Sequence, residues 1–113
     1  MEMEERPWGR YYVLEDEQTH KVKRIVVDPG KRLSYQYHHH RSEIWTVIAG
    51  NATITLNDVI HTIGPSEVFR VPQMAKHRLE NKGQTPLIII EIQYGTYFGE
   101  DDIIRLDDDF KRV

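Results

Sequence analysis

One segment near the middle of the sequence crowds together side chains that can bind a metal ion. Residues 36–43 include a glutamine, three histidines and a glutamate. If this segment ends one strand and begins the next, Gln36 and His38 share a face, because residues two apart in a strand do, and a hairpin return brings Glu43 beside them. His77 follows a turn, begins another β-type run and can supply a fourth donor. Amide, imidazole and carboxylate donors suit zinc, manganese, cobalt, nickel or ferrous iron, so we predict one divalent metal ion on Gln36, His38, Glu43 and His77.

The other histidines have simpler interpretations. Three adjacent histidines in a loop are also typical of a polar surface patch. Only one of two consecutive side chains can face inward, so His39 and His40 are expected at the surface or beside the ligands. His20 and His61 are isolated in the sequence, and we expect them to be structural.

Short β-type runs separated by turn residues make up most of the chain. The predicted strands are Tyr11–Leu14, Val22–Val27, Leu33–His38, Glu43–Ala49, Ala52–Leu56, Val59–Ile63, Glu67–Val71, His77–Glu80 and Leu87–Tyr94. Strands this short and numerous indicate an all-β sandwich or barrel. The pair Asn57 and Asp58 predicts a tight hairpin, and the tail Gly99–Val113 is expected to form either a short helix or an extended arm.

The run Leu87–Ile92 is apolar on both faces of its strand, with Glu91 as the one polar member. Such a run is typical of a central strand that is covered on each side. A second copy of the chain is one candidate cover, and unpaired sheet edges also favour subunit pairing, so we expect a homodimer.

Composition limits the classes of function. A chain of 113 residues, 39% of them hydrophobic, has room for one domain, which we place at residues 1–113. There is no cysteine, so a metal must be held by nitrogen and oxygen donors. The absence of a long apolar run and of a signal-peptide pattern predicts a soluble, cytoplasmic protein with no membrane partner. A net charge of −3 argues against nucleic acid as a partner.

The segment from Lys21 to Arg41 contains six basic residues and one acidic residue. The six are Lys21, Lys23, Arg24, Lys31, Arg32 and Arg41. A small phosphorylated ligand would suit this stretch, although a solvated strand face gives the same pattern.

Two spacings resemble the motifs of the cupin superfamily. Gly30, Gln36, His38, Glu43 and Gly50 follow the spacing of its first motif, with glutamine where many cupins have histidine. The second motif is matched by Pro72, His77 and Asn81, although Met74 stands where its glycine is usual. The resemblance implies an RmlC-like double-stranded β-helix, that is, a jelly-roll barrel.

A closer resemblance covers the chain from Arg6 to about Arg112. The matched segments, in order, are 6–9, 22–25, 29–30, 33–36, 38–45, 77–81, 90–93 and 99–105. They are similar to the C-terminal domain of type II phosphomannose isomerases, which follows a mannose-1-phosphate guanylyltransferase domain. The resemblance implies metal-dependent isomerisation of mannose 6-phosphate to fructose 6-phosphate, in mannose, GDP-mannose and polysaccharide precursor metabolism. The chain carries no Gly-rich phosphate loop for nucleotidyl transfer, and Ile44 stands where the family commonly has histidine.

Such an isomerase needs a base and groups that bind the sugar phosphate. We predict Glu91 and Lys76 as catalytic residues, with the alternative that Glu91 pairs with a buried arginine for structural reasons. Arg41, Arg78 and Gln93 are predicted to bind substrate, although Arg78 turns outward if its strand is regular.

Other readings stay open beside the isomerase. Trp45 either lines the bottom of the binding pocket or is an ordinary residue of the hydrophobic core. The chain as a whole could instead be a non-catalytic cupin that binds a sugar phosphate or nucleotide sugar. A third alternative is another cupin enzyme, such as a dioxygenase or an epimerase.

Overall fold

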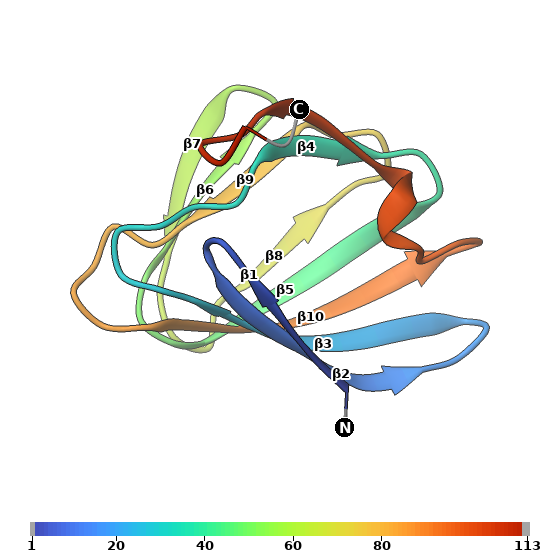
Figure 1. Ribbon diagram of the computed structural model, residues 1–113, viewed down its shortest axis with the longest axis horizontal. Coiled ribbons are helices and arrows are strands. Elements are labelled where there is room, and N and C mark those ends of the chain that lie inside the picture. The colour runs from blue at the N-terminus through green and yellow to red at the C-terminus, as the bar shows by residue number, and fades with distance from the viewer. Residues whose placement is uncertain (1, 112–113) are drawn as a thin grey trace.

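The computed structural model describes residues 2–111, which form eleven strands and one turn of 3-10 helix (Figure 1). In chain order these elements are β1 Glu2–Arg6, β2 Gly9–Asp16, β3 His20–Val27, β4 Tyr35–His38, β5 Arg41–Ala49, β6 Ala52–Leu56, β7 Val59–Ile63, β8 Val68–Val71, β9 His77–Glu80, β10 Leu87–Gly95, η1 Glu100–Asp102 and β11 Ile103–Asp107. The prediction of an all-β chain is therefore confirmed.

Two antiparallel sheets face each other around a common interior (Figure 1). The six-stranded sheet has the order β1-β2-β3-β10-β5-β8, and the five-stranded sheet has the order β11-β4-β9-β6-β7. Strands distant in the sequence are neighbours in both sheets: β10 lies between β3 and β5, and β4 lies between β11 and β9. This arrangement is why residues far apart along the chain can meet in one site.

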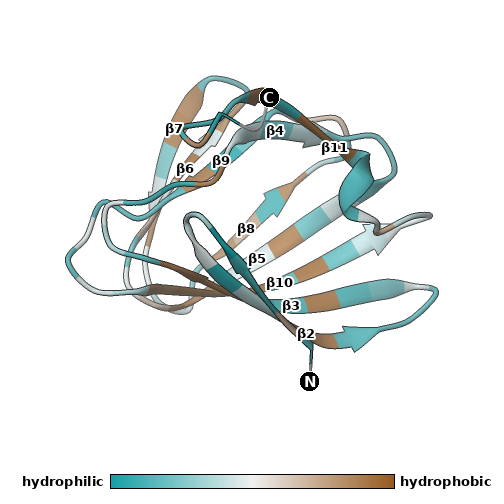
Figure 2. Cartoon of the chain, viewed as in Figure 1, coloured by the Kyte–Doolittle hydropathy of each residue, from teal (hydrophilic) through white to brown (hydrophobic). Residues whose placement is uncertain are grey.

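The inward faces of β3, β5 and β10 divide into an apolar end and a polar end. At the apolar end, buried aliphatic and aromatic side chains build the core between the sheets. They include Ile25, Val27, Trp45, Val47, Leu87 and Ile89. At the polar end, the same inward positions hold Lys23, Arg41, Glu43, Glu91 and Gln93, all buried. Figure 2 shows the resulting change from brown to teal along these strands. Polar groups are costly to bury without partners, so this end is where a site is expected.

Several strand boundaries differ from the sequence-based prediction. The predicted strand Leu33–His38 begins only at Tyr35, because Leu33 makes a single backbone hydrogen bond, from its N–H to the oxygen of Leu79. The strand β1 was not predicted, since its exposed, mostly charged residues show no apolar alternation. The tail combines both expected forms, as the single turn η1 leads into β11, which pairs with β4.

The hairpin predicted at Asn57 and Asp58 is confirmed. Both residues have positive φ, 46° and 68°, as a two-residue turn between β6 and β7 requires. The side chain of Asn57 then accepts a hydrogen bond from the backbone N–H of Lys76, at 3.0 Å. The hairpin therefore fixes the turn that leads into β9.

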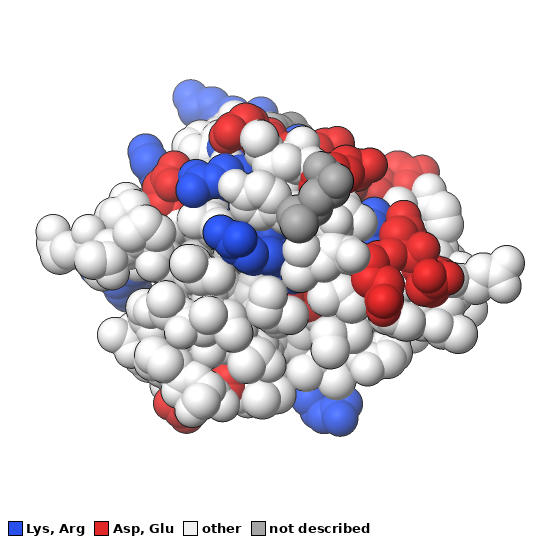
Figure 3. All heavy atoms as spheres, turned by 90° about the horizontal axis from the view of Figure 1, so that it is seen from below, with Lys and Arg blue, Asp and Glu red and all other residues white. Residues whose placement is uncertain are grey.

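On the face of the described residues seen in Figure 3, many of the acidic side chains gather toward the right, whereas the basic ones are more widely spread. No helix in residues 2–111 is long and apolar enough to span a membrane.

Candidate metal centre

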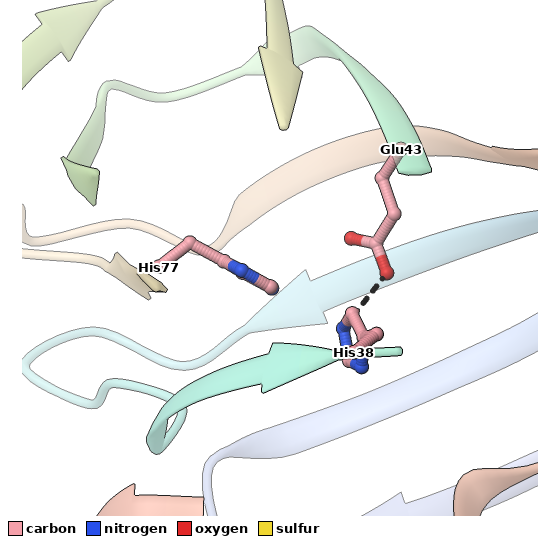
Figure 4. A group of neighbouring side chains, drawn as sticks. All are labelled: His38, Glu43 and His77. Carbon is pink, nitrogen blue, oxygen red and sulfur yellow. Dashed lines mark ion pairs between the residues drawn. The ribbon is translucent and has the colours of Figure 1, made fainter. Parts of the chain in front are cut away.

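Three of the four predicted metal ligands meet at the polar end of the interior. His38 is the last residue of β4, Glu43 lies on β5, and His77 is the first residue of β9. One ligand atom from each lies within 4.8 Å of the others, and all three side chains are buried. Figure 4 shows the His77 ring directed toward the space beside Glu43 and His38. The three strands come from both sheets, so the group exists only in the folded barrel.

His77 is held in the form that a metal needs. Its Nδ1 lies 3.0 Å from the backbone oxygen of Ala75, an acceptor, so Nδ1 carries the proton and donates it to that oxygen. Nε2 has no hydrogen-bond partner among the described residues, and neither has Nδ1 of His38. Burial lowers the pKa of His77 to about 4, which keeps the ring neutral at pH 7. A buried imidazole nitrogen with a lone pair and no partner is the observation that fits a metal ion.

Glu43 supplies the negative charge of the centre. Its Oε1 accepts a hydrogen bond from Trp45 Nε1 at 2.9 Å, and its Oε2 accepts one from Arg41 Nε at 3.0 Å. His38 Nε2 lies 3.1 Å from the same Oε2. Burial opposes ionisation, but the hydrogen bond with His38 and the charge of Arg41 hold the pKa of Glu43 well below its usual range. The carboxylate is therefore charged and oriented. Trp45 both belongs to the core and lines the site.

The donor set fits a divalent cation of the kind that prefers nitrogen and oxygen ligands. Gln36, the fourth predicted ligand, lies opposite His77 in the β4–β9 pair and lines the same cavity. Its Oε1 accepts a hydrogen bond from Ser34 Oγ at 2.8 Å. Ligation by Gln36 remains a prediction.

A cavity beside the metal centre is lined by charges of both signs. The basic residues in its wall are Arg6, Lys23, Arg41 and Arg105, and the acidic ones are Glu43, Glu91 and Glu100. Sequence reasoning placed Lys23 only in a basic stretch that would suit a phosphorylated ligand, and it did not assign Glu100 to a site. The signal for Lys23 was its place in the alternation with Ile25 and Val27, which puts it on the inward face of β3.

The other predicted site residues divide between this cavity and the outside. Arg41 and Glu91 line the cavity, and Gln93 is buried beside Glu91, to which its Nε2 donates a hydrogen bond. Lys76 is exposed and does not line the cavity, because it belongs to the turn before β9. The guanidinium of Arg78 binds the backbone oxygens of Leu33 and Asp107 and the Asp107 carboxylate, away from the cavity. The structure thus places neither Lys76 nor Arg78 in the cavity wall, and their roles remain predictions. Arg78 turns away because it follows the inward His77 in a strand.

His39 and His40 are exposed, as predicted. The buried carboxylate of Asp102 accepts hydrogen bonds from both of their backbone N–H groups, at 3.2 and 3.0 Å. It also lies 2.9 Å from His40 Nδ1. The turn η1 is thereby fastened to the loop that follows the candidate ligand His38.

Glu91 is a second carboxylate of the cavity with a displaced pKa, shifted in the direction opposite to that of Glu43. Burial first, and then the charge of Glu43, raise its pKa to about 8, against the opposing charges of Lys23 and Arg41. An unfolded chain would release this proton near pH 4.5. Between these two values the unfolded state is ionised while the folded state stays neutral, so the stability contributed by this group is complete below pH 4.5 and is lost as the pH rises toward 8.

Replacing Glu91 by glutamine should remove this pH dependence. The measurement is made with a chelator present, so that no metal is bound. The free energy of unfolding of Glu91→Gln, minus that of the unchanged chain, should increase by on the order of 1–3 kcal/mol from pH 5 to pH 8. Urea unfolding at the two pH values measures the difference. Glu17→Gln, at an exposed position, is the matched control and should show no such rise. Parallel pH profiles for Glu91→Gln and the unchanged chain would contradict the assignment.

Comparison with known proteins gives one family and one fold. Residues 2–108 match the family described as mannose-6-phosphate isomerase C-terminal. The chain is 45% identical over 108 residues to a mannose-1-phosphate guanylyltransferase of Salmonella typhimurium, covering 96% of this chain and 22% of that protein. It is 46% identical over 108 residues to an alginate biosynthesis protein of Pseudomonas aeruginosa, with coverages of 96% and 22%. The chain thus spans about a fifth of the length of these relatives.

Among solved structures, an RmlC-like cupin from Shewanella frigidimarina superposes with a TM-score of 0.75 at 23% identity, covering 88% of this chain and 86% of that one. This likeness confirms the predicted cupin fold.

The predicted activity is corrected by these findings. Sequence resemblance implied a mannose-6-phosphate isomerase. Several relatives that match nearly the whole chain are instead named for guanylyl transfer to mannose 1-phosphate, which is a different reaction. The assignment of this chain as an isomerase is therefore wrong.

Proposed function

Because the chain belongs to the mannose-6-phosphate isomerase C-terminal family, we propose that it is a metal-binding cupin module that binds a phosphorylated sugar and serves a mannose-1-phosphate guanylyltransferase. The observation that carries this proposal is the shared cavity wall. Candidate metal ligands Glu43 and His77 line the same space as the buried cations Lys23 and Arg41.

Different residues of the cavity suit different parts of such a ligand, its phosphate group and its sugar ring. Lys23 and Arg41 provide positive charge for a phosphate group, and charge-assisted hydrogen bonds are the strong ones. Arg41 is held in place through its Nε–H, which donates to Glu43. Ile25, Trp45 and Leu79 give the wall an apolar part that excludes water and suits the C–H face of a sugar ring.

His38, Glu43 and His77 would hold the metal ion. When bound, the ion supplies a positive charge and a Lewis acid for the oxygens of a ligand. The neutral His77 ring and the charged, doubly hydrogen-bonded Glu43 carboxylate suit this task, because a metal binds the deprotonated forms of both.

Mannose 1-phosphate is the ligand that best fits these features. It is the sugar phosphate in the names of several relatives, and its phosphate suits the buried cations. Since the chain spans about a fifth of those relatives, the proposed role is that of a module that holds this sugar phosphate while guanylyl transfer takes place elsewhere.

Calorimetric titration of the zinc- or manganese-loaded chain tests the proposal. We expect mannose 1-phosphate to bind at one site per chain and unphosphorylated mannose to bind at least about 10-fold more weakly, because the latter offers no charge to Lys23 and Arg41. Removal of the metal with a chelator should weaken binding further. The absence of any heat with mannose 1-phosphate, or equal affinity for mannose, would refute the proposed function.

A further inference from the structure

An internal carboxylate joins the two buried cations of the cavity. Glu100 Oε2 lies 3.2 Å from Lys23 Nζ and 3.9 Å from Arg41 Nη1. The Lys23 and Arg41 side chains are 4% and 3% exposed, whereas that of Glu100 is 35% exposed. A buried lysine without a counter-charge is costly, so this contact accounts for how Lys23 can be charged inside the barrel.

Glu100 does not belong to the barrel strands that carry its partners. It begins η1, after the segment 96–99 that leaves β10. The turn η1 is secured by Asp102 rather than by Glu100, because Asp102 holds the backbone of His39 and His40. The Glu100 side chain can therefore change its rotamer while η1 stays in place.

The two cations offer more hydrogen-bond donors than the single Glu100 oxygen accepts from, although Arg41 is also paired with Glu43. One carboxylate oxygen serves both cations, and burial raises while the charges of Lys23 and Arg41 lower the pKa of Glu100, leaving it ionised. An ammonium has three donors, and Nζ of Lys23 also lies 4.1 Å from the centroid of the Tyr11 ring. A phosphate group brings up to two charges and three acceptor oxygens to the same place.

We propose that Glu100 occupies the position of a ligand's phosphate group, and that a phosphorylated sugar binds by displacing the Glu100 carboxylate from Lys23 and Arg41. This inference rests on the proposed function and names its phosphate subsite. Lys23 and Arg41 bind the phosphate in the filled cavity, and Glu100 turns to solvent, where its exposed side already lies. Glu100 then acts as an internal competitor that also keeps Lys23 paired when the cavity is empty of ligand.

Replacing Glu100 by glutamine tests the subsite. The amide cannot compete as an anion, so Glu100→Gln should bind mannose 1-phosphate about 10-fold more tightly than the unchanged chain, measured by calorimetry. Asp101→Asn is the matched control, because Asp101 is the next residue of η1, is exposed and does not line the cavity. It should bind like the unchanged chain.

A second pair of variants tests the cation. Lys23→Met should lose at least about 10-fold in affinity, whereas Arg24→Met, one residue on and exposed on the outer side of β3, should lose none. Inorganic phosphate provides a readout of stability: it should raise the melting temperature of Glu100→Gln more than that of the unchanged chain, since it restores a counter-charge to Lys23.

The outcomes separate the subsite from the proposed function. If mannose 1-phosphate binds the unchanged chain and Glu100→Gln within 2-fold of each other, or binds Lys23→Met unchanged, the displacement is refuted while the proposed function stands. If it binds none of these proteins, both are refuted.

Discussion

Replacing His77 by alanine is expected to abolish stoichiometric metal binding. Loss of groups that only orient a ligand typically costs 10–100-fold in metal affinity, so removal of the ligand itself should cost at least about 100-fold. The effect is large because the centre has few alternatives: the described His, Asp and Glu side chains that gather there are His38, Glu43 and His77. Elemental analysis after dialysis against zinc or manganese measures the loss.

His39→Ala is the matched control for this experiment. His39 follows the candidate ligand His38 directly, but its side chain is exposed and turns toward Tyr37, with ring centroids 5.3 Å apart. The control should retain the metal, and far-UV circular dichroism should show the same β-sheet signal for both variants. If His77→Ala kept the metal, or if His39→Ala lost it, the centre would have to be placed on the exposed histidines instead.

Alternation of side chains made most of the barrel predictable. In Ala52–Leu56, for example, Ala52 and Ile54 are buried and Thr53 and Thr55 are not, as a half-buried strand requires. The same rule placed Glu43 and Trp45 on one face of β5. It failed for β1, whose residues have no apolar face to reveal it and which forms by pairing with β2.

Nearness in sequence was a poor guide to the rest of the site. Lys76 and Arg78 flank a candidate ligand and yet do not line the cavity, whereas Lys23 lies far from every ligand in the chain and does. The pairing of β10 with β3 brings Lys23 opposite Glu91, and the Glu100 carboxylate then lies near both Lys23 and Arg41. Long-range pairing of this kind leaves no local pattern, and Glu100 reaches the cavity only because the ambiguous tail folds back over it.

Asn81 is a polar residue of the barrel that the sequence motif singled out, and its contacts are structural. It is 1% exposed, and its Nδ2 donates to the backbone oxygens of Val27 and Thr85 at 2.9 and 2.8 Å. Its Oδ1 accepts from the N–H of Gly83 at 2.9 Å. One side chain thus joins the end of β9 to the end of β3 and to the loop before β10.

Replacing Asn81 by alanine should therefore destabilise the fold without affecting the metal. The buried oxygen of Val27 would lose its partner, and so would two partly buried groups, the oxygen of Thr85 and the N–H of Gly83. We therefore expect a loss of about 2 kcal/mol and a fall in melting temperature on the order of 8 °C. Thermal unfolding of the metal-free chain measures it. Asn51→Ala, at an exposed turn position, is the control, and its melting temperature should lie within about 2 °C of that of the unchanged chain. A difference of 1 kcal/mol in stability corresponds to about 4 °C for a chain of this size.

Below the melting transition, Asn81→Ala should still take up one metal ion, because His38, Glu43 and His77 do not contact this network. A melting temperature equal to that of the unchanged chain, or a loss of metal by the folded variant, would show that Asn81 acts through the centre and not through the strand ends.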